Sequence, residues 1–595
     1  MAAGAQGQRR PDATGYRLED VDVMYAPGTS EATRRLGGGI ICRAFADEQE
    51  VKQLIQHDGA DAKSLPGLRA RGCSRGMAYR LLSLAIDDLS GIAMTSRWAI
   101  DNEWRAHPIS LPQWPSRQLE AAIINALIDG GADIGLAVDA ASRPMRVAIC
   151  GGNDEAVSVL LARGAAVRQE VDDFDSFVMS LPDAIAARIG RRVPLDYERR
   201  LLSIYRRLIQ NDATLATEQG GDGLGCNLVH DAACREMGQY SQAFVDAYLD
   251  LLVANGASLT AQGRHGWTPL HLAARVPSPC VADFLCRHAP PAEINKGMPL
   301  DPNKTPLVFA GSGLDWAVQA SQDDTMPQLT RDTATSEIPL YEAVIRTLLR
   351  SGADIDRMPT ATDKERQCRQ LVLPQYTTVL NELPTTTIAA VNAAMRPQRG
   401  LAAFLMKSLP ALLPHLLQPP HTGTTPANPP AAPLLPAPPG YGPHEAEAIG
   451  WKIAAMCFDQ DAASEAISGS IGIRNSTLAR RVTAAAEHFV KSAVFEASSN
   501  REVVGGMANM GGQMVRVPLQ CFAVNGGHYG GHRRLGLREV VHRAQLDEAA
   551  RHGIEEGAID KGFNTHLGND DCEFGGWQQL GRIDEGGQWV SLGIN

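Results

Sequence analysis

The chain has 595 residues, of which 44% are hydrophobic, and this length is enough for several hydrophobic cores. Its formal net charge of −11 is modest and gives no support to nucleic-acid binding. No run of 18 or more apolar residues predicts a membrane span, and the first thirty residues lack the apolar core of a secretory signal. These features exclude an integral membrane protein and predict a soluble cytoplasmic one.

The cysteines and the first residues carry little functional information. Eleven cysteines are spread along the chain, with Cys280 and Cys286 the nearest pair, so we expect reduced thiols rather than disulfides or a zinc ribbon. Residues 1–35 are polar and rich in glycine, alanine and arginine, and they are expected to form a disordered leader.

One sequence pattern recurs between residues 36 and 413. An apolar helical stretch is followed by glycine, which suits the left-handed residue that ends a helix and turns the chain. The copies are Val51 to Asp61, Leu127 to Asp133, Glu155 to Ala165, Leu251 to Ala257 and Leu348 to Asp354. Shorter helices are predicted before several of them, at 82–86, 143–149, 227–233 and 305–310.

The clearest copy of such a first helix is His265-Gly266-Trp267-Thr268-Pro269-Leu270-His271-Leu272-Ala273-Ala274. Gly266 permits a tight turn, and Thr268 can cap a helix that has Pro269 in its first position. Leu270, Ala273 and Ala274 share one helical face, and the two alanines let a second helix approach closely.

This segment resembles the hairpin and first helix of an ankyrin repeat. The resemblance implies that His271 hydrogen-bonds loop backbone and has a structural rather than catalytic role. It also implies a mainly α fold with a solenoid of about six or seven degenerate helix-turn-helix repeats over 36–413, because one unit cannot bury its apolar face alone. We expect insertions at 87–115, 168–199 and 313–339, where the spacing is irregular.

A proline-rich linker is predicted next, at 414–443, where eleven of thirty residues are proline. Such a segment cannot continue a helix and favours an extended polyproline-like spacer. Prolines 430, 433, 436 and 439 also lie on one edge of a polyproline helix, which is the geometry that SH3-type grooves bind. No flanking arginine sets an orientation, so a plain linker is the favoured interpretation.

The pattern over residues 444–595 predicts a small α+β module, which we assign to no family. Asn475 or Ser476 can cap an amphipathic helix running to Ala493, and a second helix is expected over 537–552. Met514 to Val524 reads as a strand or hairpin among Gly-Gly pairs, and short strands are expected in the closing stretch 574–594. The glycine pairs fit neither a phosphate loop nor a GxGxxG dinucleotide motif, so we expect no nucleotide cofactor.

The same module holds the only catalytic candidates. Cys521 is followed by His528 and Asp571, the ingredients of a nucleophile, a base and an orienting partner. Inert domains carry the same residue types, and the interpretation of Cys521 as a structural thiol is favoured. His528 and His532 have the spacing of helical metal ligands, but the glycines between them indicate a loop, so no metal is expected.

The favoured function is a protein-binding scaffold or adaptor. Ankyrin-like arrays bind proteins on the concave face made by hairpin tips and first helices, and there Arg264, His265 and Trp267 have the composition of a binding hot spot. The competing interpretation is that Trp267 packs against the next hairpin.

Two alternatives remain open: a target-modifying enzyme that uses Cys521 and is guided by the array, and a C-terminal module that only caps or oligomerises the solenoid. The alanine, arginine, glycine and proline usage is typical of GC-rich bacteria. Bacterial ankyrin proteins often resemble effectors secreted into a host cell, which is an expectation from analogy.

Overall fold

The computed structural model describes most of the chain. The described residues are 16–71, 76–92, 94, 97–100, 106–135, 143–168, 177–182, 192–220, 225–416, 443–510, 512–525, 531–562, 572 and 574–594. They form two compact units, the first comprising residues 1–348 and 354–372, and the second residues 349–353 and 373–595.

The first unit is built mainly from helices, most of them short. They are α1 (Glu31–Cys42), α2 (Glu48–Gln56), α3 (Leu81–Ala85), α4 (Arg117–Asp129), α5 (Pro144–Cys150), α6 (Asp154–Ala162), α7 (Leu195–Asn211), α8 (Leu228–Arg235), α9 (Gln242–Ala254), α10 (Pro269–Arg275), α11 (Pro279–His288), α12 (Pro306–Gln322) and α13 (Gln328–Arg350). None of the described helices in either unit is long and apolar enough to cross a membrane.

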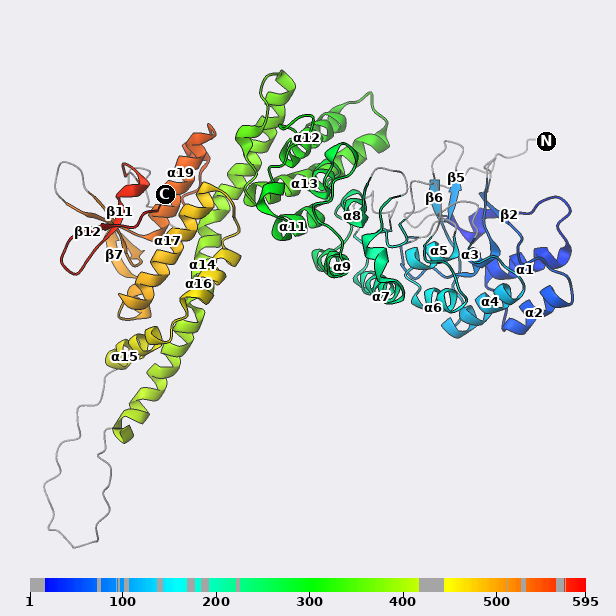
Figure 1. Ribbon diagram of the computed structural model, residues 1–595, viewed down its shortest axis with the longest axis horizontal. Helices are drawn as coiled ribbons and strands as arrows, with labels where there is room; N and C mark the ends of the chain where they lie inside the picture. Colours follow the sequence, from blue (N-terminus) through cyan, green and yellow to red (C-terminus); the bar gives the residue numbers. More distant parts are fainter. Residues whose placement is uncertain are drawn as a thin grey trace, which may run out of the picture. The chain divides into compact units, whose positions relative to one another are not determined.

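These helices pack in two rows (Figure 1). In one row α2, α4, α6, α7, α9 and α11 each contact the next, and in the other α1, α3 and α5, then α8, α10 and α12, do the same. The buried side chains are small or aliphatic where the rows meet, such as Ala273 and Ala274 of α10 and Val281 of α11, all fully buried. Each helix pair therefore buries its apolar side against its neighbours along the chain.

Glycines follow the helices at the five predicted copies. Gly59, Gly131, Gly164, Gly256 and Gly352 all have positive φ, between 71° and 97°. A side chain would strain the backbone in this conformation, which explains why glycine recurs at these positions. Helices α7, α11 and α12 end without glycine, at Asp212, Ala289 and Asp323.

The irregular stretches have different structures. Before α7 the described residues 177–182 are buried but not helical, and the hydroxyls of Tyr205 and Tyr248 donate to the carbonyls of Ser180 and Met179 at 2.7 and 2.9 Å. Over 313–339, where an insertion is expected, the long helices α12 and α13 run instead, with Pro339 inside α13.

Two small sheets lie at the start of this unit. In one, β1 (Tyr16–Arg17) pairs in parallel with β6 (Ala106–Ser110), which pairs antiparallel with β5 (Trp98–Ile100). In the other, β2 (Val21–Met24) pairs with β3 (Gly67–Ala70), and β3 with β4 (Met77–Ala78), both antiparallel. Strands and helix α1 thus occupy the described part of 1–35, which was expected to be a disordered leader. These strands pair with strands far along the chain, so the segment is folded although its local composition does not favour a folded structure.

The second unit contains a sheet and a helical layer. Its helices are most of α14 (Asp363–Leu416), then α15 (Pro443–Met456), α16 (Gln460–Ser470), α17 (Thr477–Phe495), α18 (Asn500–Val504) and α19 (Leu537–Arg551). Ser476 caps α17 and α19 covers the second predicted helix, so both helix predictions are confirmed. Helix α17 contacts α15, α16 and α19.

Short strands complete this unit. A four-stranded sheet has the order β10 (Arg533–Leu535), β9 (Phe522–Val524), β11 (Leu580–Ile583) and β12 (Trp589–Ser591), with all pairs antiparallel. A separate hairpin joins β7 (Gly506–Met510) to β8 (Gln513–Val517). The segment 514–524, expected to be a strand or hairpin, therefore belongs to two strands that pair with different partners, divided near Pro518, which cannot donate to a ladder.

The two units divide within α14, after residue 372, and not at the expected boundary after residue 413. Residues 373–416 pack within the second unit, where Gln545 Nε2 donates to Leu380 O at 2.7 Å and Gln398 Nε2 donates to Trp451 O at 3.1 Å. The helix is continuous across its prolines, so the local sequence contains no signal of the division. Most of the predicted linker, 417–442, lies outside the described residues.

Candidate functional site

The hairpin before α10 is held in one conformation by its backbone. Gly263 N donates to Trp267 O at 2.7 Å, closing the turn that contains Arg264, His265 and Gly266. Gly266 has a φ of 83°, and a Cβ on it would lie 2.3 Å from Cδ of Pro299 in the following loop. Glycine is therefore required both by conformation and by the close approach of the next loop.

Helix α10 begins as the sequence predicts. Thr268 is its N-cap, and the Thr268 Oγ1 accepts from His271 N at 3.5 Å. Pro269 occupies the first helical position, where no N–H is needed.

His271 is a structural residue, which confirms its predicted role. Its Nδ1 lies 2.8 Å from Thr268 Oγ1, and its Nε2 lies 3.0 Å from Lys296 O in the next loop. The carbonyl can only accept, so Nε2 carries the proton. Burial lowers the pKa of His271 to about 4, and the ring is neutral at pH 7.

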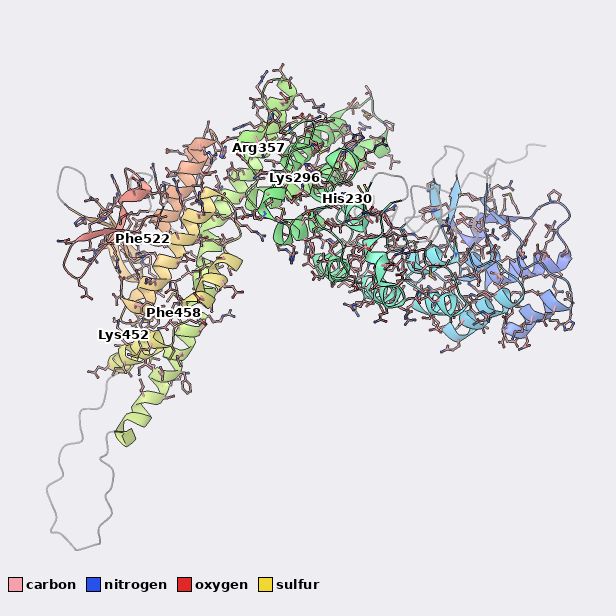
Figure 2. The ribbon with its side chains drawn as sticks, in the orientation of Figure 1. His230, Lys296, Arg357, Lys452, Phe458 and Phe522 are labelled. Carbon is pink, nitrogen blue, oxygen red and sulfur yellow. The ribbon has the colours of Figure 1, made fainter. Side chains whose placement is uncertain are left out.

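His230, which is labelled in Figure 2, repeats this arrangement one helix pair earlier. Its Nδ1 lies 2.8 Å from Asn227 Oδ1, and its Nε2 lies 3.2 Å from Trp267 O. Burial lowers the pKa of His230 as well. Two successive imidazoles therefore tie the start of a first helix to the following loop, and the loop that His230 contacts carries Trp267.

Trp267 is partly buried and packs on the next helix pair. Its ring centroid lies 4.7 Å from that of Phe309 on α12, with the planes tilted by 42°. The Arg275 guanidinium, at the end of α10, lies 5.3 Å from the Trp267 ring centroid. The residue thus has a packing contact, as the competing interpretation expects, and retains an accessible surface.

Arg264 and His265 are exposed at the tip of the hairpin, and His265 has a φ of 64°. The three predicted binding residues therefore lie on one hairpin, and Phe309 and Arg275 contact Trp267. Phe309 stands four residues after Thr305, as Leu272 stands four residues after Thr268. Aligning the two first helices is the signal that could have found it.

Comparison with protein families finds a match in this part of the chain. Residues 265–296 match the ankyrin repeat family. The matched repeat contains the hairpin, α10, α11 and the loop whose Lys296 carbonyl accepts from His271. No curated protein matches the chain.

Of the three catalytic candidates, the structure describes Cys521. Burial, with a smaller contribution from the Glu496 carboxylate, raises the pKa of the Cys521 thiol, which is the opposite of what a thiolate nucleophile requires. Its histidine neighbour is His488, whose Nε2 lies 3.2 Å from the Cys521 backbone oxygen rather than the sulfur. His528 and Asp571 lie outside the described residues.

The second unit has an arginine–aromatic cluster of its own. Trp577 is 6% exposed, and its Nε1 donates to Asp547 Oδ2 at 2.9 Å. Arg543 Nη2 lies 2.9 Å from Asp547 Oδ1, and the Arg481 guanidinium lies 4.9 Å from the Trp577 ring centroid. This cluster anchors the C-terminal segment to α17 and α19. Across the described residues, no group of three His, Cys, Asp or Glu side chains is arranged to hold a metal ion.

Proposed function

We propose that this chain is a protein-interaction scaffold. Its first unit would form an ankyrin-like solenoid, and a protein partner would bind on the side of the hairpin tips and first helices. The match over 265–296 supports an interaction role in general, since ankyrin repeats bind proteins. The two rows of helices and the equivalent histidines 230 and 271 support extending the repeat beyond the matched residues.

The observation that carries the proposal is the surface around Trp267. A half-buried tryptophan lies between Phe309 and the exposed Arg275, and tryptophan and arginine are the residues most enriched in binding hot spots. Phe309 holds the indole in place, so a partner would bind a surface whose geometry is already fixed. Preorganisation of this kind reduces the entropy lost on binding.

Photo-cross-linking with the full chain tests the proposal. A photoreactive amino acid at His265 should give a protein adduct from cell lysate, while the same residue at Arg206, exposed on α7, should not. A threefold molar excess of unlabelled chain should compete with the adduct, and unlabelled chain carrying Trp267→Ala should compete less well. Equal adducts from both positions would refute a binding site at the hairpin.

The intact mass of the captured partner separates a scaffold from an enzyme. A scaffold leaves the mass of its partner unchanged, whereas a Cys521-dependent modification would change it in the native chain and not in Cys521→Ala. The raised pKa of this thiol favours the scaffold. Delivery into a host cell is a separate part of the proposal, and a translocation reporter fused to residues 1–60 tests it.

A further inference from the structure

The segment that carries Trp267 contains more basic than acidic residues. Between residues 264 and 309 there are five lysines and arginines and three acidic residues, whereas the whole chain carries −11. Each of the three acids is already ion-paired. Asp283 Oδ2 lies 2.8 Å from Arg287 Nε, Glu293 Oε1 lies 2.7 Å from Lys296 Nζ, and Asp301 Oδ2 lies 3.9 Å from Lys304 Nζ.

The two remaining basic residues of this stretch are Arg264 and Arg275. Both are exposed, and neither forms an ion pair with any residue that the structure describes. Arg275 cannot pair within its own helix in the usual way, because the residue four positions before it is the buried, neutral His271. In the preceding first helix, by contrast, Arg235 Nε lies 2.8 Å from Asp231 Oδ1.

The position of Arg275 is fixed by its surroundings. The Tyr341 hydroxyl donates to Arg275 O at 2.8 Å, and the guanidinium lies over the Trp267 ring. A guanidinium in this position keeps its donors available to a planar oxyanion beside the indole. The free positive charge and the aromatic surface are therefore adjacent.

We propose that the occupant of this surface is an acidic peptide segment. Its carboxylates would accept hydrogen bonds from Arg264 and Arg275, and an apolar side chain between them would lie on Trp267 and Phe309. This inference rests on the proposed function and specifies its partner. The inference does not extend to nucleic acid, although nucleic acid is also a polyanion. Two unpaired arginines at this surface, in a chain of net charge −11, are too few to offset a phosphate backbone.

Selection from a random twelve-residue peptide display library, with the full chain as bait, tests this inference. The selected peptides should be enriched in Asp and Glu around an aromatic or aliphatic residue. Fluorescence polarisation of the best peptide should then give an affinity that falls about five- to tenfold in Arg275→Gln and in Arg264→Gln, since each removes hydrogen bonds to a charged group. The affinity should also fall as salt is raised.

Arg206→Gln on α7 is the matched control, since it removes an exposed arginine elsewhere in the same unit and should leave the affinity unchanged. The double reversal Arg264→Glu/Arg275→Glu should select basic peptides in place of acidic ones. Thermal melting of every variant excludes misfolding as the cause of lost affinity.

The outcomes separate this inference from the proposed function. Neutral or basic peptides that bind the native chain and lose affinity in Trp267→Ala would overturn the acidic partner and leave the scaffold standing. Peptides indifferent to Trp267→Ala and to both arginine substitutions would overturn both. Failure to select any peptide, or tighter binding of a twelve-nucleotide single strand than of any peptide, would overturn the acidic segment, while the His265 cross-link would still judge the scaffold.

Discussion

Two tryptophans, one in each unit, contact arginines but have different surroundings. Trp577 is 6% exposed and donates to Asp547, whose carboxylate also neutralises Arg543. Trp267 is partly exposed, and the Arg275 above it has no carboxylate partner among the described residues. The same residue types thus form a cluster with a shared carboxylate in one unit, where Arg543, Asp547 and Trp577 also line an open pocket, and a surface without such a carboxylate in the other. Composition alone does not distinguish the two arrangements; the carboxylate does, and we propose that its absence leaves Arg275 available to a partner.

The largest expected effect is at the Trp577 cluster. Trp577→Ala should lower the free energy of unfolding of the second unit by about 4 kcal/mol, because it leaves a cavity and removes the hydrogen bond to Asp547. Urea denaturation followed by circular dichroism measures this loss. A change below about 1 kcal/mol, within the range of ordinary surface substitutions, would show that the cluster is not a structural anchor.

Acid should destabilise the helix pair beneath the surface around Trp267. The pKa of His271 is lowered from 6.5 to about 4, so its contribution is present above pH 6.5 and is lost as the pH falls towards 4. Over this range the unfolded chain binds the proton and the native chain does not, which costs roughly 3 kcal/mol. Urea denaturation at pH 7.5 and pH 4.5 should reveal the loss, and His271→Gln should flatten it.

Glu236, in the same region, should give stability the opposite dependence on pH. This buried carboxylate accepts from Gly238 N at 3.0 Å and from Cys280 N at 3.2 Å, and burial raises its pKa from 4.5 to about 7. Its contribution is present below pH 4.5 and is lost as the pH rises through 7, because the native chain then holds a proton that the unfolded chain has released. Glu236→Gln, measured over pH 4.5–8, should therefore reduce the loss of stability on the alkaline side. An unchanged pH profile would place the charge of Glu236 in contact with solvent.

Trp267→Ala should have a smaller effect on stability than Trp577→Ala. The indole is only partly buried, so we expect a loss of about 1.5 kcal/mol from the contact with Phe309. Paired urea denaturation of the two variants makes the comparison directly. A loss as large as that of Trp577→Ala would make Trp267 a core residue and remove the reason for assigning it a binding role.

The sequence predicts those features of the fold that depend on local backbone chemistry. Thr268 and Ser476 cap their helices and the glycines at the five predicted helix ends have positive φ, because caps and left-handed residues are set by one or two side chains. The continuity of α14 and the buried segment 177–182 depend on contacts between residues far apart in the chain, which no local pattern encodes. For the candidate site, the hairpin residues follow from the repeat motif, whereas the contact with Phe309 depends on how one helix pair stacks on the next and the contact with Arg275 on the position of the last residue of α10.

The smallest expected effect on stability is at Arg275, and it is the most informative for function. Arg275→Gln removes an exposed charge and one cation–π contact but no ion pair among the described residues, so the free energy of unfolding should change by less than about 0.5 kcal/mol. Arg543→Gln, which breaks the ion pair with Asp547, should cost more under the same urea titration. If the two variants lose equal stability, the contrast between a balanced and an unbalanced arginine fails. If Arg275→Gln is neutral for stability and weakens peptide binding, its charge serves a partner rather than the fold.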